Sequence, residues 1–170
     1  WGIVTKTFAY TNHTVMAEAL EKWDVGLVKE IIPRIFQIIL EINRRYCAEL
    51  FEKTGGDSAK TTRISIIKDN VIHMATLCVV ASHSVNGVSK LHSEIIKESV
   101  FHDEYLDTPE KFKNVTNGIA YRRWLYQSNP GLTNLLRKKI GDGFLKDGAE
   151  LAKLRNYKDD KAVLLELQKV

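Results

Sequence analysis

Two short polar stretches of the chain carry side chains that could bind a polar ligand. The first, YTNHT, contains His13, and the second, VNGV, contains Asn86. An imidazole and a carboxamide both donate and accept hydrogen bonds, which is the chemistry that a hydroxyl-rich ligand requires. Each residue also has a structural interpretation. His13 could be a buried histidine bonded to a neighbouring carbonyl, and Asn86 could simply form a turn with the glycine that follows it.

The first stretch is also compatible with N-glycosylation. Asn12 and Asn114 both begin an Asn-x-Thr acceptor sequence, which would indicate surface loops of a secreted protein. However, Cys47 and Cys78 are isolated within apolar stretches, as free thiols of a reducing compartment are. The first residues also lack the pattern of a signal peptide. We therefore expect a cytoplasmic protein, which weakens the glycosylation interpretation of both asparagines.

Several other ligand classes are not expected. None of the five histidines lies at a zinc-ligand spacing from a cysteine or a carboxylate, and no glycine-rich nucleotide motif is present. The net charge of +4 arises from 25 basic and 21 acidic residues that are well mixed. The one basic run, at 137–139, falls where a helix should end and suits the helix dipole better than a nucleic acid. No apolar run approaches the ~18 residues of a membrane span. We expect no metal, nucleic-acid or membrane partner.

Helices are expected to position the two polar stretches. Residues 24–53 predict helix, and Pro33 suits the first turn of a second helix because a missing N–H costs nothing there. The apolar residues beyond it recur at helical spacing and predict one buried face. They are Ile35, Ile39, Ile42, Tyr46 and Leu50.

The segment around Asn86 predicts a helix, a short strand and another helix. Residues 63–67, RISII, predict an earlier strand, and Asp69 or Asn70 then caps the first helix. Ser89 begins the helix that follows Asn86. Because the carboxyl ends of strands in an α/β sheet face the ligand crevice, Asn86 is expected at its mouth. The inward-facing residues of the two helices are expected to be Met74, Leu77, Cys78 and Ala81, and then Leu91, Ile95 and Ile96.

The remaining residues predict one more strand and a helical end. Residues 113–119, KNVTNGI, predict a strand that again ends in Asn-Gly. A helix is expected between Pro130 and Gly141, and a last helix is expected after Asp159 or Asp160. The predicted fold class is α/β, mainly helical, with a few short parallel strands.

Motifs spread along nearly the whole chain resemble the glycogen, starch and maltodextrin phosphorylases, in the order in which that family has them. A long ordered series of this kind is more specific than any single short motif. The motifs are AYTNHT (9–14), EALEKW (18–23), PR…QII…EINRR (33–45), SHSVNGVSKLHSEI (82–95), KFKNVTNGI (111–119), RRWL (122–125) and NPGL (129–132).

The resemblance implies an enzyme that transfers a terminal α-1,4-glucosyl unit of a glucan to inorganic phosphate, giving glucose 1-phosphate. It also implies the GT-B architecture of two Rossmann-like domains. Residues 1–119 would be the C-terminal part of the N-terminal domain, and 120–170 the interdomain crossing and the helical start of the second domain. The family holds pyridoxal phosphate on a lysine of its C-terminal half, which these residues lack. We therefore expect the isolated chain to bind no cofactor and to be inactive. The resemblance also leads us to expect that the intact enzyme is a homodimer.

The resemblance also assigns the sugar contacts. His13 would hydrogen-bond the glucosyl 6-hydroxyl, and its backbone carbonyl would lie near the anomeric carbon, where positive charge develops in the transition state. Asn86 would bind sugar hydroxyls through its amide. His83 and Asn117 are expected to be structural. The chain departs from the family at Ala120-Tyr121, where Thr-Pro is usual, and this change removes no sugar contact.

An alternative function belongs to a different class. The chain could be a stand-alone carbohydrate-binding or packing module that has the fold without the catalysis. In either case the isolated segment should expose sheet edges and apolar faces, and such edges favour pairing between chains. We therefore expect the segment to self-associate.

Overall fold

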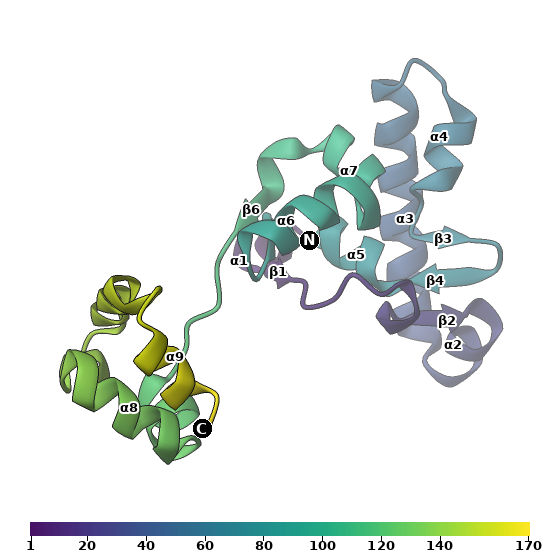
Figure 1. Ribbon diagram of the computed structural model, residues 1–170. Helices are drawn as coiled ribbons and strands as arrows, with labels where there is room; N and C mark the ends of the chain where they lie inside the picture. The colour runs from purple at the N-terminus through teal and green to yellow at the C-terminus, as the bar shows by residue number, and fades with distance from the viewer. The chain divides into compact units, whose positions relative to one another are not determined.

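The computed structural model describes all 170 residues, and they divide into two compact units, 1–117 and 118–170. The first unit is α/β and the second is helical (Figure 1). The strands are β1 (Ala9–Thr11), β2 (Lys22–Asp24), β3 (Ile67–Lys68), β4 (Val71–His73), β5 (Ser84–Gly87) and β6 (Phe112–Asn114). The helices of the first unit are α1 (Gly2–Thr7), α2 (Val25–Ile31), α3 (Pro33–Lys53), α4 (Ser58–Arg63), α5 (Met74–Ala81), α6 (Lys90–Ile95) and α7 (His102–Asp107).

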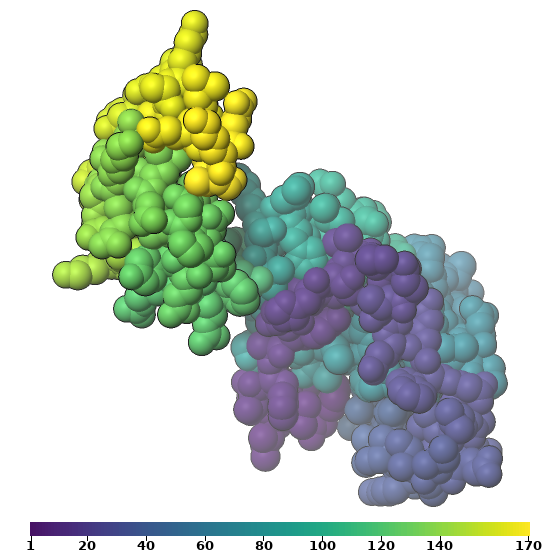
Figure 2. Space-filling model, turned by 60° about the horizontal axis from the view of Figure 1, so that its bottom comes forward, coloured from purple at the N-terminus to yellow at the C-terminus, as the bar shows by residue number.

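A three-stranded parallel sheet has the order β1-β5-β6 and confirms the expected parallel strands. The register places Thr11 beside Asn86, and Asn86 beside Lys113, so the three strands end at the same edge. Parallel neighbours need a long crossover, and here α6, a π-helical turn (Ile96–Val100) and α7 connect β5 to β6. In the space-filling view the purple N-terminal segment lies across the teal part of the first unit, as the β1–β5 pairing requires (Figure 2).

The core of the parallel sheet is apolar and aromatic. Val85 and Ile96 are buried at 0% and 1% exposure, and Phe101 packs against Tyr10 in an edge-to-face contact with 6.1 Å between ring centroids. Leu91 is an exception to the expected inward face of α6, because its side chain is 71% exposed. The predicted strand at 113–119 is also corrected. It begins one residue earlier, ends at Asn114 and does not reach the second Asn-Gly pair.

A second sheet, antiparallel and in the order β2-β4-β3, was not predicted. Asp69 and Asn70 both have positive φ angles, 51° and 61°, as the two central residues of a tight hairpin turn require. They therefore join β3 to β4, and the prediction that one of them caps a helix was wrong. The predicted strand at 63–67 was largely wrong too. Arg63 ends α4, and the strand starts only at Ile67.

The long helix α3 begins at Pro33, as predicted, and the proline breaks the expected continuous helix at 24–53. Ile32 has φ −133° and ψ 62°, because proline disfavours helical geometry in the residue before it. On the predicted apolar face, Ile39 and Leu50 are buried, whereas Ile35 is 47% exposed. Ile39 packs with Val28, Ile66 and Ile72 in the core of the antiparallel sheet.

Helix α5 lies between the two cores, which explains why it carries apolar side chains toward both of them. Ala75 and Val79 belong to the core of the parallel sheet. Met74 and Leu77 pack against the core of the antiparallel sheet instead. The predicted inward face therefore describes only part of the surface that α5 buries.

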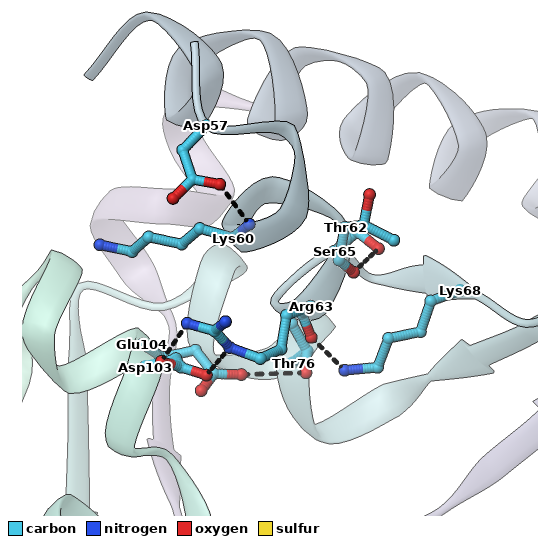
Figure 3. Close-up of polar contacts among 9 residues, drawn as sticks. All are labelled: Asp57, Lys60, Thr62, Arg63, Ser65, Lys68, Thr76, Asp103 and Glu104. Carbon is cyan, nitrogen blue, oxygen red and sulfur yellow. Dashed lines mark hydrogen bonds and ion pairs between the residues drawn. The ribbon is translucent and has the colours of Figure 1, made fainter. Parts of the chain in front are cut away.

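Polar contacts connect the first turn of α7 to α4 and α5 (Figure 3). Arg63 forms two hydrogen bonds with the Asp103 carboxylate, at 2.6 and 2.9 Å, and this pairing lowers the pKa of Asp103. The next residue, Glu104, is buried and accepts a hydrogen bond from Thr76 at 3.2 Å. Burial raises the pKa of Glu104. Two neighbouring carboxyl groups thus have opposite pKa shifts.

The second unit contains α8 (Pro130–Ile140), α9 (Lys161–Leu167), a π-helical turn (Arg122–Gln127) and two 3₁₀ segments (Gly143–Leu145 and Gly148–Tyr157). Both predicted helix starts are confirmed: Asn129 caps α8 through Leu132 N–H at 3.0 Å, and Asp160 caps α9. Tyr121 packs so closely on Gly148 that a Cβ there would lie 2.3 Å from the ring, so a larger residue would have to displace the tyrosine side chain. No helix in either unit has both the length and the apolar composition needed to cross a bilayer.

Candidate functional site

The candidate site is the edge of the parallel sheet at which β1, β5 and β6 end. Backbone hydrogen bonds continue past the strands and fix the three loops that follow them. Asn12 N–H donates to the Asn86 carbonyl at 2.9 Å, Val115 N–H to the Gly87 carbonyl at 3.1 Å, and Asn117 N–H to the Val88 carbonyl at 2.9 Å. The carboxyl ends of parallel strands form the usual ligand crevice of α/β folds. The structure therefore brings the loop after Thr11 and the loop after Gly87 to one edge of the parallel sheet.

Asn86 lies at this edge, as predicted, and its side chain already has protein partners. Its Oδ1 accepts from the Thr11 hydroxyl at 3.0 Å, and its Nδ2 donates to the Gly87 carbonyl at 3.0 Å. The residue is 9% exposed. A carboxamide has two N–H groups and two acceptor lone pairs, so these two bonds use half of its capacity. Asn86 thus joins β1 to β5 through its side chain, and these two bonds leave one N–H and one lone pair of the amide unused.

His13 follows β1 in the neighbouring loop and has an exposed side chain. The residue before it, Asn12, is only 2% exposed and bonds to the Tyr10 hydroxyl at 3.2 Å and to Thr14 N–H at 3.0 Å. This short-range bond to Thr14 closes a turn that presents the imidazole to solvent. Because the amide nitrogen of Asn12 is buried, it is inaccessible to a glycan. The sequence YTNHT therefore forms a fixed turn in which the side chain of His13 is exposed to solvent.

His92 was not singled out from the sequence, although it belongs to the same edge. It lies in the first turn of α6, where its Nδ1 accepts from Val88 N–H at 3.0 Å. Its Nε2 lies 3.4 Å from the carbonyl oxygen of Thr14. One imidazole thus spans the loops that carry His13 and Asn86. The available sequence signal was a histidine three residues after the capping serine Ser89, whose hydroxyl accepts from His92 N–H.

Gly87 allows α6 to approach the end of β5. A Cβ on Gly87 would lie 2.7–2.9 Å from the atoms of Ser93, which is fully buried. The Ser93 hydroxyl lies 2.8 Å from the Asn114 side-chain oxygen, so α6 also contacts the end of β6. The Asn-Gly pair of VNGV is therefore needed for close packing as well as for the strand end.

The chemistry available at this edge is hydrogen bonding to hydroxyl groups. No group of three or more histidine, cysteine or acidic side chains in the chain could hold a metal ion. His83 lies at the opposite end of β5, where its N–H donates to the Phe8 carbonyl at 3.0 Å. It is exposed but remote from the edge by its position along the strand.

Comparison with known proteins agrees with this architecture. The family model described as carbohydrate phosphorylase matches residues 1–170. The chain is 47% identical to the brain form of glycogen phosphorylase from Rattus norvegicus over all of its residues and 21% of that protein. It is 44% identical to the muscle form from Mus musculus and 47% identical to the liver form from Homo sapiens, again over its whole length and 20% of each. The chain therefore spans about one fifth of the relatives that it matches. With the family model covering every residue, the chain belongs to the carbohydrate phosphorylase family.

Proposed function

We propose that this chain is the part of an α-glucan phosphorylase that holds the terminal glucosyl unit during transfer to inorganic phosphate. The product would be glucose 1-phosphate. The observation that supports this most directly is that the loop carrying His13 starts at the sheet edge where Asn86 lies, in a chain 44–47% identical to glycogen phosphorylases. The intact enzyme would have the GT-B architecture, with residues 1–119 in its N-terminal domain and 120–170 leading into the second.

The proposed contacts follow from the chemistry of a sugar ring. The exposed imidazole of His13 would hydrogen-bond the 6-hydroxyl. The backbone carbonyl of His13 would face the anomeric carbon, so that its negative end stabilises the positive charge of the transition state. The free N–H and lone pair of the Asn86 amide would bind a second hydroxyl, which can donate and accept in the same way.

Pyridoxal phosphate is proposed to bind the intact enzyme outside these residues. It would supply a phosphate group beside the substrate phosphate. Burial lowers the pKa of one lysine of the chain, but that lysine does not lie at this edge. Lys111, the lysine whose pKa is lowered by burial, donates to the Val79 carbonyl at 3.3 Å. It precedes β6 and so lies at the end of the sheet away from His13.

The decisive experiment is His13→Ala in the intact enzyme that contains these residues, assayed with maltodextrin and phosphate for release of glucose 1-phosphate. We expect kcat/KM to fall by about 2–4 kcal/mol of transition-state stabilisation. His83→Ala is the matched control, because it removes another exposed histidine from the opposite end of the same sheet. Equal activity of the two variants would defeat the proposal.

The second candidate function, a binding module without catalysis, makes a different prediction for the isolated chain. Titration with glucose or maltodextrin should reveal millimolar or tighter binding that requires His13 and Asn86 if the chain is a module. We expect no such binding and no turnover, because the phosphate-handling groups would lie elsewhere in the enzyme.

The proposed partners are the glucan and phosphate, with a homodimer as the intact form in a cytoplasmic setting. Free Cys47 and Cys78 support a reducing compartment. The isolated chain should self-associate, because β1 and β6 are open sheet edges and large apolar side chains such as Ile3 and Phe8 are 82% and 59% exposed. Light scattering at rising protein concentration should show an increasing average mass. A monomer at every concentration would contradict this prediction.

A further inference from the structure

We infer that His92 is a positioning residue that sets the orientation of the His13 loop relative to the end of β5. This inference rests on the proposed function of the same edge. His92 does not itself contact His13 or Asn86, the two residues proposed to bind the sugar. Its ring nitrogens instead contact Val88, which follows the end of β5, and Thr14, which follows His13.

The hydrogen bonds assign the tautomer of the ring. Val88 N–H is a donor, so Nδ1 of His92 must be the unprotonated acceptor at 3.0 Å. In the neutral ring the proton is then on Nε2, which donates towards the Thr14 carbonyl at 3.4 Å. A ring with both nitrogens protonated could not accept from Val88. The neutral imidazole is therefore the form that connects the two loops.

The connection restrains His13 from its C-terminal side. On the N-terminal side, Asn12 is already fixed by its backbone bond to the Asn86 carbonyl and by its buried side chain. Thr14 is fixed by its N–H bond to Asn12 and by the contact of its carbonyl with His92. His13 therefore lies between two anchored residues, and only one of the anchors reaches across to α6. Without His92, Thr14, the residue that follows His13, would lose its long-range contact.

The local structure holds His92 in place for this role. Its own N–H donates to the hydroxyl of Ser89, the residue that caps α6, at 3.1 Å. Because Gly87 has no side chain, Ser93 packs directly on the end of β5 and fixes α6 there. The imidazole is half-buried, so its bonds are partly shielded from water. A displacement of about 1 Å at a reacting group can cost about 100-fold in rate, which makes such a support kinetically important.

The kinetic test uses three variants of His92 in the intact enzyme, assayed with maltodextrin and phosphate. His92→Ala removes both contacts. His92→Asn keeps an acceptor near the position of Nδ1 but does not reach Thr14, whereas His92→Gln places an N–H near the position of Nε2. We expect kcat, normalised to the folded fraction, to fall about 10- to 100-fold in the alanine variant, with KM changed less than about threefold. Gln should recover most of the loss and Asn little.

Two results would overturn the inference. The first is an alanine variant with kcat within about twofold of the unmodified enzyme, and the second is equal kcat for Asn and Gln. His13→Ala serves as the reference in the same assay. If His13→Ala loses activity and the His92 variants do not, only the positioning role fails. If His13→Ala is itself fully active, the proposed function fails and the positioning role with it.

A spectroscopic test in the 170-residue chain does not depend on turnover. Long-range ¹H–¹⁵N NMR should show the neutral form of the His92 ring protonated on Nε2 and unprotonated on Nδ1. The Val88 amide should exchange slowly with solvent, and this protection should be lost in His92→Ala but kept in His92→Asn. A neutral ring protonated on Nδ1 would overturn the inference whatever the kinetics show.

Discussion

The two small sheets of the first unit differ in what they bury. The parallel sheet buries polar side chains at its carboxyl edge, where Asn12, Asn86 and Ser93 are at most 9% exposed and each has a partner on another residue. The antiparallel sheet buries Ile66 and Ile72, and its polar turn residues are at the surface. Buried polar groups require defined partner geometry, whereas apolar contacts are not directional. The comparison indicates that the two sheets differ at their polar ends: the carboxyl edge of the parallel sheet has a defined geometry, whereas the turn of the antiparallel sheet is exposed.

The largest expected effect tests the apolar core of the antiparallel sheet. Ile72→Ala should lower the free energy of unfolding by about 2–5 kcal/mol, because the side chain is fully buried between α3 and the sheet and leaves a cavity. Urea unfolding of the chain measures the change. Leu91→Ala is a control from the other sheet's crossover, and its 71% exposure predicts almost no change. Similar losses in both variants would remove the distinction between the two regions.

A smaller effect tests the polar carboxyl edge of the parallel sheet. Asn86→Ala in the intact enzyme should lower kcat/KM by about 1–3 kcal/mol if the proposed sugar contact exists, because a sugar hydroxyl would then lose its partner. Thr11→Val is the matched variant, since it removes the bond between β1 and β5 without changing the amide. If Asn86 only joins the strands, the two variants should lose the same activity. A larger loss for Asn86→Ala supports its proposed contact with the sugar.

A still smaller effect tests the buried carboxyl group beside the parallel sheet. The pKa of Glu104 is raised by burial, so its contribution to stability is present at acid pH and is lost as the pH rises through the folded-state pKa. Glu104→Gln should therefore be the more stable protein at pH 7, by about 1 kcal/mol, with the difference vanishing towards pH 4. Thermal unfolding across this pH range measures it. A difference that does not depend on pH would show that ionisation of Glu104 is not its cause.

The neighbouring residue supplies a control of opposite sign. The pKa of Asp103 is lowered, first by its hydrogen bond to Arg63, so its contribution is present at neutral pH and is lost as the pH falls. Asp103→Asn should be the less stable protein at pH 7. The effect should be below about 1 kcal/mol, because the Arg63 side chain is 57% exposed and water screens the pair.

Signals that act within one turn of the chain were predictable from the sequence. Pro33 begins α3, Ser89 caps α6 and Asn129 caps α8, because each effect depends on residues at most four positions away. The position of Asn86 at a strand end was also predictable, from turn-forming residues and from the resemblance to a family. The assignments of His13 and Asn86 to a sugar remain predictions that the proposed experiments test.

Only the tertiary structure decided which distant segments meet. Strand β2 pairs with β4, and each is three residues long, too short to show a period in the sequence. Asp69 and Asn70 suit a helix cap and a hairpin turn equally well, and the neighbouring strands selected the turn. The sequence placed His92 only in the first turn of a capped helix, and its contacts with Val88 and Thr14 arise from the packing of α6 on Gly87. The sequence alone determined the helix caps and the polar strand end, because these features depend only on residues that are close together in the chain. Pairing and burial between remote segments required the folded chain, because no local preference specifies them.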